Sequence, residues 1–294
     1  MNPATIPVCQ AADPAVRAPR FDVPALACDT HAHVFGPQHR YAYTANRTYT
    51  PPDAPLADYL ALHRRLGIER GVLVQPSVYG TDNQAMLDAL AQLGEHYRGV
   101  AVIDPDIDDR ELQRLHQAGI RGVRVNLLFK GGISFADVER IAARIQPLGW
   151  HVQALLDVSE FDDLQRRLGS LPVDVVIDHM GHMDTAKGLG HPGFQALLQL
   201  LASGRCWVKL SAAYRFTRET ATPYRDVLPV AQALVRTAPE RMLWGSDWPH
   251  PFVHIPMPND GALLDMLADW VPDAGLREQI LVHNPARLYG FPRP

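Results

Sequence analysis

The 294 residues of this chain include 47% hydrophobic and 20% charged residues, and the formal net charge is -4. This composition is typical of a globular protein and argues against extensive disorder. The acidic balance offers no cationic surface for a phosphate backbone, so we expect no nucleic acid partner. No apolar run reaches the length of a membrane span, so we expect no membrane association.

The N-terminal residues 1–24 are predicted to form an irregular arm, because their prolines remove backbone hydrogen-bond donors. Segment 1–21 lacks the basic start and apolar core of a signal peptide, and the three cysteines lie far apart. We therefore expect a reducing, cytoplasmic location. We expect no chemistry from the arm, and residues 25–294 are predicted to form a single catalytic domain.

The first predicted strand, residues 26–35, ends with two imidazoles on one face. His31 and His33 are two residues apart, and alternate residues of a strand point to the same side. A His-x-His pair after an acidic residue is more typical of a functional site than of structural residues alone. The long loop 36–55 follows, and its Tyr49 is predicted to reach substrate, with simple packing as the alternative.

From residue 56 onward, segments with helical spacing alternate with short apolar runs. Helices are predicted over 56–66, 84–93, 109–118, 135–148, 161–168, 194–203 and 227–238. Strands are predicted over 71–77, 98–104, 120–128, 151–157, 173–182, 206–214 and 241–250. Together with the first strand, these runs make eight strands, each followed by a helix or a loop.

The predicted strands are near-continuous apolar runs, which is typical of parallel strands that are covered on both faces. Eight such units predict an α/β protein with a (β/α)8 barrel. An open doubly wound sheet is the alternative. We favour the barrel because polar residues collect at the C-terminal ends of almost all the strands, where barrels place their active sites.

Two further predicted strands end in candidate catalytic residues. The sixth ends near His179 and the eighth near Asp247, and in a closed barrel both ends face the first strand. An aspartate near imidazoles can accept a proton from water, and three imidazoles suit a metal ion or a polarised carbonyl oxygen. We assign His182 and His250 to supporting roles.

Basic residues on the same rim indicate an anionic substrate. Arg124 lies within the fourth predicted strand, Lys130 just beyond it and Arg215 just after the seventh. Cations that face a site with a single aspartate favour a substrate carboxylate over a protein carboxylate. Ser77, at the end of the second strand, can add a hydroxyl group.

Three motifs resemble those of a known family. The segments D-T-H-A-H (29–33), D-H-M-G-H (178–182) and W-G-S-D-W-P-H (244–250) occur in this order on the βα pattern. They are similar to motifs of the amidohydrolase superfamily, in the branch that contains 2-pyrone-4,6-dicarboxylate lactonase, and the likeness extends over about residues 21–291. It implies a distorted (β/α)8 barrel that hydrolyses a small anionic lactone.

The resemblance also implies roles for individual residues. Catalytic positions fall on His31, His33, His179 and Asp247, and substrate contacts fall on Tyr49, Ser77, Arg124 and Arg215. No cofactor is expected to be required, and the alternative is one divalent metal, such as zinc, on His31, His33 and Asp247. A two-metal centre is not expected, because the fifth predicted strand offers only Gln153 as a polar side chain.

The chain departs from the lactonase pattern at Lys130, Leu156 and Phe252, where that pattern has an arginine, a tyrosine and an asparagine. A lysine lacks the planar two-pronged grip of an arginine on a carboxylate. We therefore expect a carboxylated lactone whose second substituent is less polar or smaller than in the pyrone dicarboxylate. A sugar-acid lactone isomerase, a metal-dependent decarboxylase and a non-catalytic metabolite-binding barrel are the alternatives.

Overall fold

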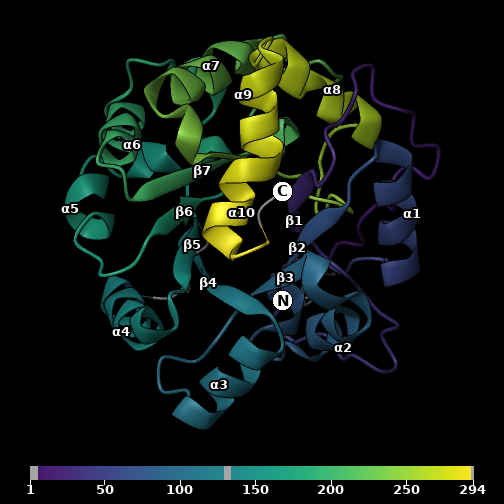
Figure 1. The fold of residues 1–294 in the computed structure, drawn as a ribbon, viewed down its shortest axis with the longest axis vertical. Coiled ribbons are helices and arrows are strands. Elements are labelled where there is room, and N and C mark those ends of the chain that lie inside the picture. Colours follow the sequence, from purple (N-terminus) through teal and green to yellow (C-terminus); the bar gives the residue numbers. More distant parts are fainter. Residues whose placement is uncertain (1–5, 129–133, 293–294) are drawn as a thin grey trace, which may run out of the picture.

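The computed structural model describes residues 6–128 and 134–292, in which eight parallel strands form one sheet in the chain order β1 to β8. Figure 1 shows these strands at the centre of a ring of helices, so the predicted (β/α)8 barrel is confirmed. The strands are β1 (Cys28–Ala32), β2 (Arg70–Val74), β3 (Tyr97–Ala101), β4 (Ile120–Asn126), β5 (His151–Leu155), β6 (Val175–Ile177), β7 (Cys206–Leu210) and β8 (Met242–Trp244).

The helices follow the predicted alternation and cover the outside of the sheet. They are α1 (Leu56–Leu66), α2 (Gln84–Leu93), α3 (Asp109–Gln117), α4 (Phe135–Ile145), α5 (Leu164–Leu168), α6 (Pro192–Ala202), α7 (Leu228–Thr237), α8 (Asp260–Trp270), α9 (Ala274–Glu278) and α10 (Asn284–Tyr289). Local signals set their ends: Asp108 caps α3 by accepting from the amide of Glu111, and Gly67 ends α1 with a left-handed φ of 75°. Within the described residues, none of these helices combines the length and apolarity needed to cross a bilayer.

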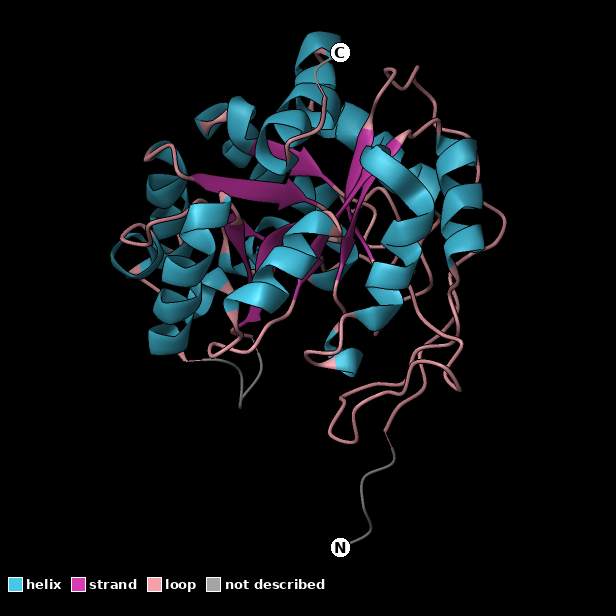
Figure 2. Ribbon diagram, turned by 60° about the horizontal axis from the view of Figure 1, so that its bottom comes forward, coloured by secondary structure: helices cyan, strands magenta, loops and turns pink. Residues whose placement is uncertain are grey.

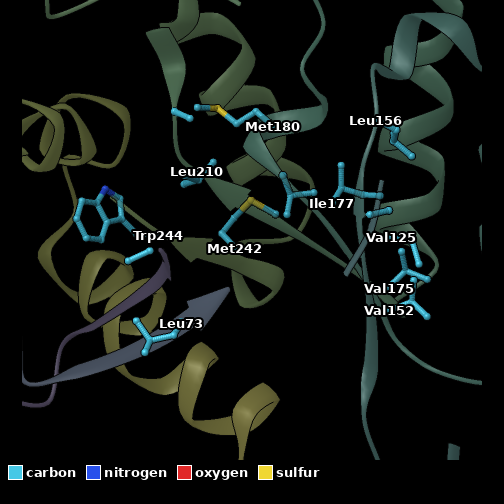
Figure 3. Close-up of a cluster of buried hydrophobic side chains, with 14 of the residues drawn as sticks. Leu73, Val125, Val152, Leu156, Val175, Ile177, Met180, Leu210, Met242 and Trp244 are labelled. Atoms are coloured by element: carbon cyan, nitrogen blue, oxygen red, sulfur yellow. The ribbon is translucent and has the colours of Figure 1, made fainter. Parts of the chain in front are cut away.

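Alternate strand residues divide into two apolar layers. One set, from Cys28 on β1 to Leu243 on β8, packs with Tyr289 and Phe291 of the C-terminal segment. In Figure 1 this segment lies across the ring of strands, and in Figure 2 it lies at the end opposite the long loops. The other set packs against the helices, and Figure 3 shows Leu73, Val125, Val152, Val175, Ile177, Leu210, Met242 and Trp244 among it.

The barrel closes at its C-terminal end. The amide of Asp247 donates to the carbonyl of His31 at 2.8 Å, and the amide of His33 donates to the carbonyl of Trp248 at 2.8 Å. Gly245 permits this approach, because a Cβ atom there would lie 2.7 Å from the Cβ atom of His31. The bonds that join β1 to the segment after β8 therefore also bring the predicted catalytic residues together.

Two strands are much shorter than predicted. β6 and β8 contain three residues each, whereas strands were predicted over 173–182 and 241–250. Two residues after β6 and three residues after β8, His179 and Asp247 adopt φ values of 52° and 62°, which the sheet ladder does not accommodate. The chain thus leaves the sheet at the two candidate catalytic residues, a position at which backbone strain is common.

Residues 6–24 form no helix, and they attach to the barrel through a few polar contacts. The guanidinium of Arg17 and the amide of Arg20 both donate to the carboxylate of Asp265 on α8, at 2.9 and 2.7 Å. Farther toward the N-terminus, the amide of Cys9 donates to the carbonyl of Thr50 at 2.9 Å. The arm therefore contacts the same loop that carries Tyr49.

Candidate active site

A cavity of about 440 Å³ opens at the C-terminal ends of the strands. It is lined by seven of the residues predicted to form the site, namely His33, Tyr49, Ser77, Arg124, His179, Arg215 and Asp247. His31 does not line the cavity but is fully buried beside it, and Lys130 lies outside the described residues. The structure therefore brings the described part of the predicted site to one place.

The Asp247 carboxylate is buried, and its two oxygen atoms have different surroundings. Oδ2 accepts from the Tyr214 hydroxyl at 2.6 Å and from Nε of Arg215 at 2.8 Å, and Nη2 of Arg215 lies at 2.6 Å. Oδ1 has no hydrogen-bond donor among the described residues. Its neighbours are Nε2 of His31 and of His33, both at 3.5 Å, and Nε2 of His179 at 3.8 Å.

Charge keeps Asp247 ionised in spite of its burial. Burial alone would raise the pKa of the carboxyl group, but the guanidinium of Arg215 outweighs it and holds the pKa well below its usual range. Burial acts in the opposite direction on the imidazoles. It lowers the pKa of His31 to about 4 and also lowers the pKa values of His33 and His179, so all three are neutral at pH 7.

Hydrogen bonds fix which nitrogen of His33 faces the cavity as an acceptor. Nδ1 of His33 lies 2.7 Å from the carbonyl oxygen of Val74, which can only accept, so Nδ1 carries the hydrogen. Nε2 of His33 therefore presents a lone pair toward Oδ1 of Asp247. In His179, Nδ1 lies 2.9 Å from the Ser211 hydroxyl, which can donate to it and leave a hydrogen on Nε2.

A second buried carboxylate, Asp178, lies on the other side of His31. Its Oδ1 is 3.2 Å from Nδ1 of His31, and its Oδ2 lies 3.3 Å from Nε of Arg124 and 3.2 Å from Nε2 of Gln153. Burial would raise the pKa of Asp178, but these cations and donors, together with Lys209, hold it well below its usual range.

Lys209 is fully buried in the middle of β7. Its Nζ donates to the Thr30 carbonyl at 2.8 Å and to the side chain of Gln153 at 2.7 Å, and it lies 3.3 Å from Nδ1 of His31. Burial lowers the pKa of Lys209 from 10.5 to about 8, although Asp178 opposes the shift. Lys209 was not predicted from the sequence, yet a lone lysine in an otherwise apolar strand is a signal, because lysine is almost never fully buried without a partner.

The structure adds to one expectation about substrate-facing residues and corrects another. Arg124 and Arg215 line the cavity, and each also contacts a buried carboxylate, Asp178 and Asp247 respectively. Leu156 was expected to border the substrate, but it is fully buried in the apolar layer against the helices (Figure 3). The sequence placed it at the strand end without resolving which face it takes.

One wall of the cavity is apolar. The ring of Phe252 stacks on Tyr49 with a centroid distance of 5.6 Å and an angle of 21°. The apolar side chains that line this cavity are Leu128, Leu155, Pro251, Phe252, Val253 and Ile255. Phe252 therefore borders the cavity as predicted, and Leu155 rather than Leu156 represents the fifth strand.

The site also fits a single metal ion. The ligand atoms of His31, His33 and Asp247 lie within 4.8 Å of one another, and all three residues are buried. Two imidazoles and a carboxylate are a common set of zinc ligands, and His33 donates its other ring N–H to a backbone carbonyl, as metal-bound histidines usually do. A second set with mutually close ligand atoms comprises His31, Asp178 and His179.

The sequence profile described as Amidohydrolase matches residues 28–291, and the chain therefore belongs to the amidohydrolase family. It is 41% identical to a 2-pyrone-4,6-dicarboxylate hydrolase of Comamonas testosteroni over 92% of each chain. It is 40% identical to a 4-sulfomuconolactone hydrolase of Rhizobium radiobacter over 97% of this chain and 99% of the other.

A similar crystal structure, from Acinetobacter baumannii, is described as a probable 2-pyrone-4,6-dicarboxylic acid hydrolase with citric acid bound. Its TM-score is 0.81 at 33% identity, over 90% of this chain and 100% of that one. The resemblance inferred from the three motifs is thus confirmed at the level of the family and of the fold.

Proposed function

We propose that this protein is a hydrolase that opens the ring of a carboxylated lactone. The observation that carries the proposal is the asymmetry of Asp247, whose Oδ2 is occupied by donors while Oδ1 faces Nε2 of His31, His33 and His179 at the cavity. A water molecule there can donate one hydrogen to Oδ1 and the other to the lone pair of His33. Relatives that are named as lactone hydrolases support this assignment.

In the proposed reaction, the water oxygen bonds to the lactone carbonyl carbon and Asp247 takes one of its protons. The ring C–O bond then breaks, and the released ring oxygen takes up the proton that Asp247 accepted, which returns Asp247 to its ionised form. Asp247 is a weak base, because Arg215 strongly stabilises its charge, so the proton moves as the new C–O bond makes the water acidic. His179, whose Nε2 can carry the hydrogen, is the imidazole best placed to donate to the carbonyl oxygen.

The substrate class follows from the walls of the cavity. Arg124 and Arg215 line it and keep guanidinium nitrogens beyond those that bind Asp178 and Asp247, which suits a substrate carboxylate. Phe252 and Leu155 line the same cavity and give an apolar substituent a surface to pack against, while Asn126 and His254 are polar groups that also line it. A buried polar group left unpaired costs about 1–3 kcal/mol, so the favoured lactone carries one carboxylate and a less polar second substituent.

A substrate panel tests this proposal. Pyrone carboxylates, muconolactones that include 4-sulfomuconolactone, and sugar-acid lactones would be assayed for ring opening, ring closure and isomerisation. We expect ring opening of a monocarboxylated lactone to have the highest kcat/KM. A pyrone dicarboxylate that is best by a wide margin would contradict the interpretation of the apolar wall, and isomerisation without net hydrolysis would contradict the reaction class.

Metal analysis decides how the carbonyl is activated. If a metal is present, His31, His33 and Asp247 would hold it, and it would supply Lewis-acid polarisation of the carbonyl. We propose that turnover needs no metal, because Asp247 and neutral imidazoles already provide an acceptor and donors. Protein with less than about one tenth of an equivalent of zinc should keep full turnover after chelation. Loss of turnover that added zinc restores would contradict this.

A further inference from the structure

Asp247 contacts a series of three buried polar side chains, Tyr214, His250 and Asp260, of which only Tyr214 also lines the cavity. The Tyr214 hydroxyl lies 2.6 Å from Oδ2 of Asp247 and 3.0 Å from Nδ1 of His250. Nε2 of His250 lies 3.1 Å from Oδ1 of Asp260, the first residue of α8. His250 and Asp260 are fully buried and do not line the cavity, so neither can touch substrate there.

The donor and the acceptor of each hydrogen bond in this series can be assigned by starting from Asp247. Asp247 is ionised and can only accept, so the 2.6 Å contact requires the Tyr214 hydroxyl to donate to Oδ2. Tyr214 has a single hydrogen, so its oxygen must accept from Nδ1 of His250. A histidine with a hydrogen on Nδ1 has only a lone pair on Nε2 unless a further proton lies between Nε2 and Asp260.

The Asp260–His250 pair must therefore hold one proton between its two facing atoms. Without that proton, a lone pair of His250 and a carboxylate oxygen of Asp260 would face each other at 3.1 Å inside the protein. Neither carboxylate oxygen of Asp260 has another hydrogen-bond partner among the described residues, and Nε2 of His250 likewise has none, so each of these groups has only the other as a polar neighbour, at 3.1 Å. The pair thereby fixes Nδ1 of His250 as a donor.

We infer that Asp260 and His250 are positioning residues that act on Asp247 through Tyr214, an inference that rests on the proposed role of Asp247. The series keeps the Tyr214 hydrogen directed at Oδ2, which holds the carboxylate plane in place together with Arg215. Oδ1 is then the oxygen that remains for water. Without the donor at Nδ1 of His250, the Tyr214 hydroxyl can turn away from Asp247, and the carboxylate loses one of its fixed donors.

Two pairs of variants separate hydrogen bonding from packing. In His250→Asn the amide nitrogen takes the place of Nδ1 and can still donate to Tyr214, whereas His250→Phe fills the volume without a donor. In Asp260→Asn the amide can donate to Nε2 of His250 and preserve the donor at Nδ1, whereas Asp260→Leu cannot. The matched control is His151→Asn. His151 is also buried, in β5, and among the described residues it makes no hydrogen bond with Tyr214, His250 or Asp260.

We expect His250→Asn and Asp260→Asn to retain kcat within about threefold, and His250→Phe and Asp260→Leu to lose roughly tenfold to a hundredfold. KM should change less than about threefold throughout, because neither residue lines the cavity. The control should match wild type. If the apolar variants equal or exceed the amide variants in kcat, both residues are only packing elements and the inference fails. Two pairs at different positions keep the test usable if one apolar variant does not fold.

A spectroscopic measurement tests the hydrogen direction without reference to turnover. In protein with ¹⁵N-labelled histidine, the hydrogen on Nδ1 of His250 should give a downfield proton signal coupled to that nitrogen. The signal should disappear in His250→Asn and persist in Asp247→Asn. Its absence from wild type would overturn the inference. A wild-type turnover of Asp247→Asn with the signal intact would instead overturn the proposed function and leave the hydrogen-bonded series standing.

Discussion

Asp178 and Asp247 are two buried carboxylates on opposite sides of His31, and each contacts an arginine, yet only Asp247 lines the cavity. Both oxygens of Asp178 have a nitrogen within 3.3 Å, whereas the nearest nitrogens to Oδ1 of Asp247 are at 3.5 Å. Oδ1 of each carboxylate lacks a hydrogen-bond partner among the described residues, but only Asp247 lines the cavity. We therefore expect the chemistry at Asp247 and an orienting role for Asp178.

The comparison predicts a large difference between two isosteric variants. Asp247→Asn keeps the shape but cannot accept a proton, so kcat should fall by roughly two to four orders of magnitude with KM within about threefold. Asp178→Asn leaves the free oxygen of Asp247 in place, so kcat should fall by no more than about tenfold. Steady-state kinetics on both variants check this. Wild-type turnover of Asp247→Asn, or an equal loss in both variants, would contradict the assignment.

The sequence alone predicted the barrel, because eight apolar runs separated by helical spacing leave few other folds. It also predicted His31, His33, His179 and Asp247, since polar residues at the ends of parallel strands must meet on one rim. These predictions depend on periodicity and on strand order, which a sequence states directly. Their catalytic roles remain predictions.

The partners of those residues could not be predicted in the same way. Tyr214 and Asp260 lie 46 residues apart in the chain and meet only through His250, so no spacing rule connects them. The pairing of Arg215 with Asp247 depends on the left-handed φ of 62° at Asp247, which re-aims the carboxylate after β8. Contacts between residues that are far apart in the chain, and that depend on single backbone angles, leave no periodic pattern in the amino-acid sequence.

The two arginines provide a second, smaller contrast. Arg124→Ala should raise KM for a carboxylated lactone roughly tenfold to a hundredfold, but raise KM for its neutral ester less than about threefold. Arg215→Ala should also lower kcat, because Asp247 loses its guanidinium partner. Without that cation the pKa of Asp247 rises, so the acid limb of the kcat profile should move to higher pH. Equal effects of Arg124→Ala on acid and ester would exclude a carboxylate contact.

The last prediction concerns stability rather than turnover, and it depends on Lys209, whose Nζ lies 3.8 Å from Oδ1 of Asp178. In the folded protein its amine loses a proton near pH 8, whereas in the unfolded chain it keeps the proton up to about pH 10.5. Between these values the unfolded state binds more protons, so this lysine makes the free energy of unfolding rise with pH. Below pH 8 the buried charge lowers that free energy by about 3 kcal/mol relative to a neutral amine.

Lys209→Met removes this titration while it keeps the length of the side chain. The difference in free energy of unfolding, wild type minus variant, should therefore rise from about pH 8 upward with a slope that approaches ~1.4 kcal/mol per pH unit. Urea unfolding between pH 7 and pH 10 measures it, with Lys187→Met as the control, because the Lys187 side chain is 37% exposed. Parallel curves for wild type and Lys209→Met would mean that Asp178 keeps the amine charged throughout, and the two carboxylates would then both serve as permanent counter-ions.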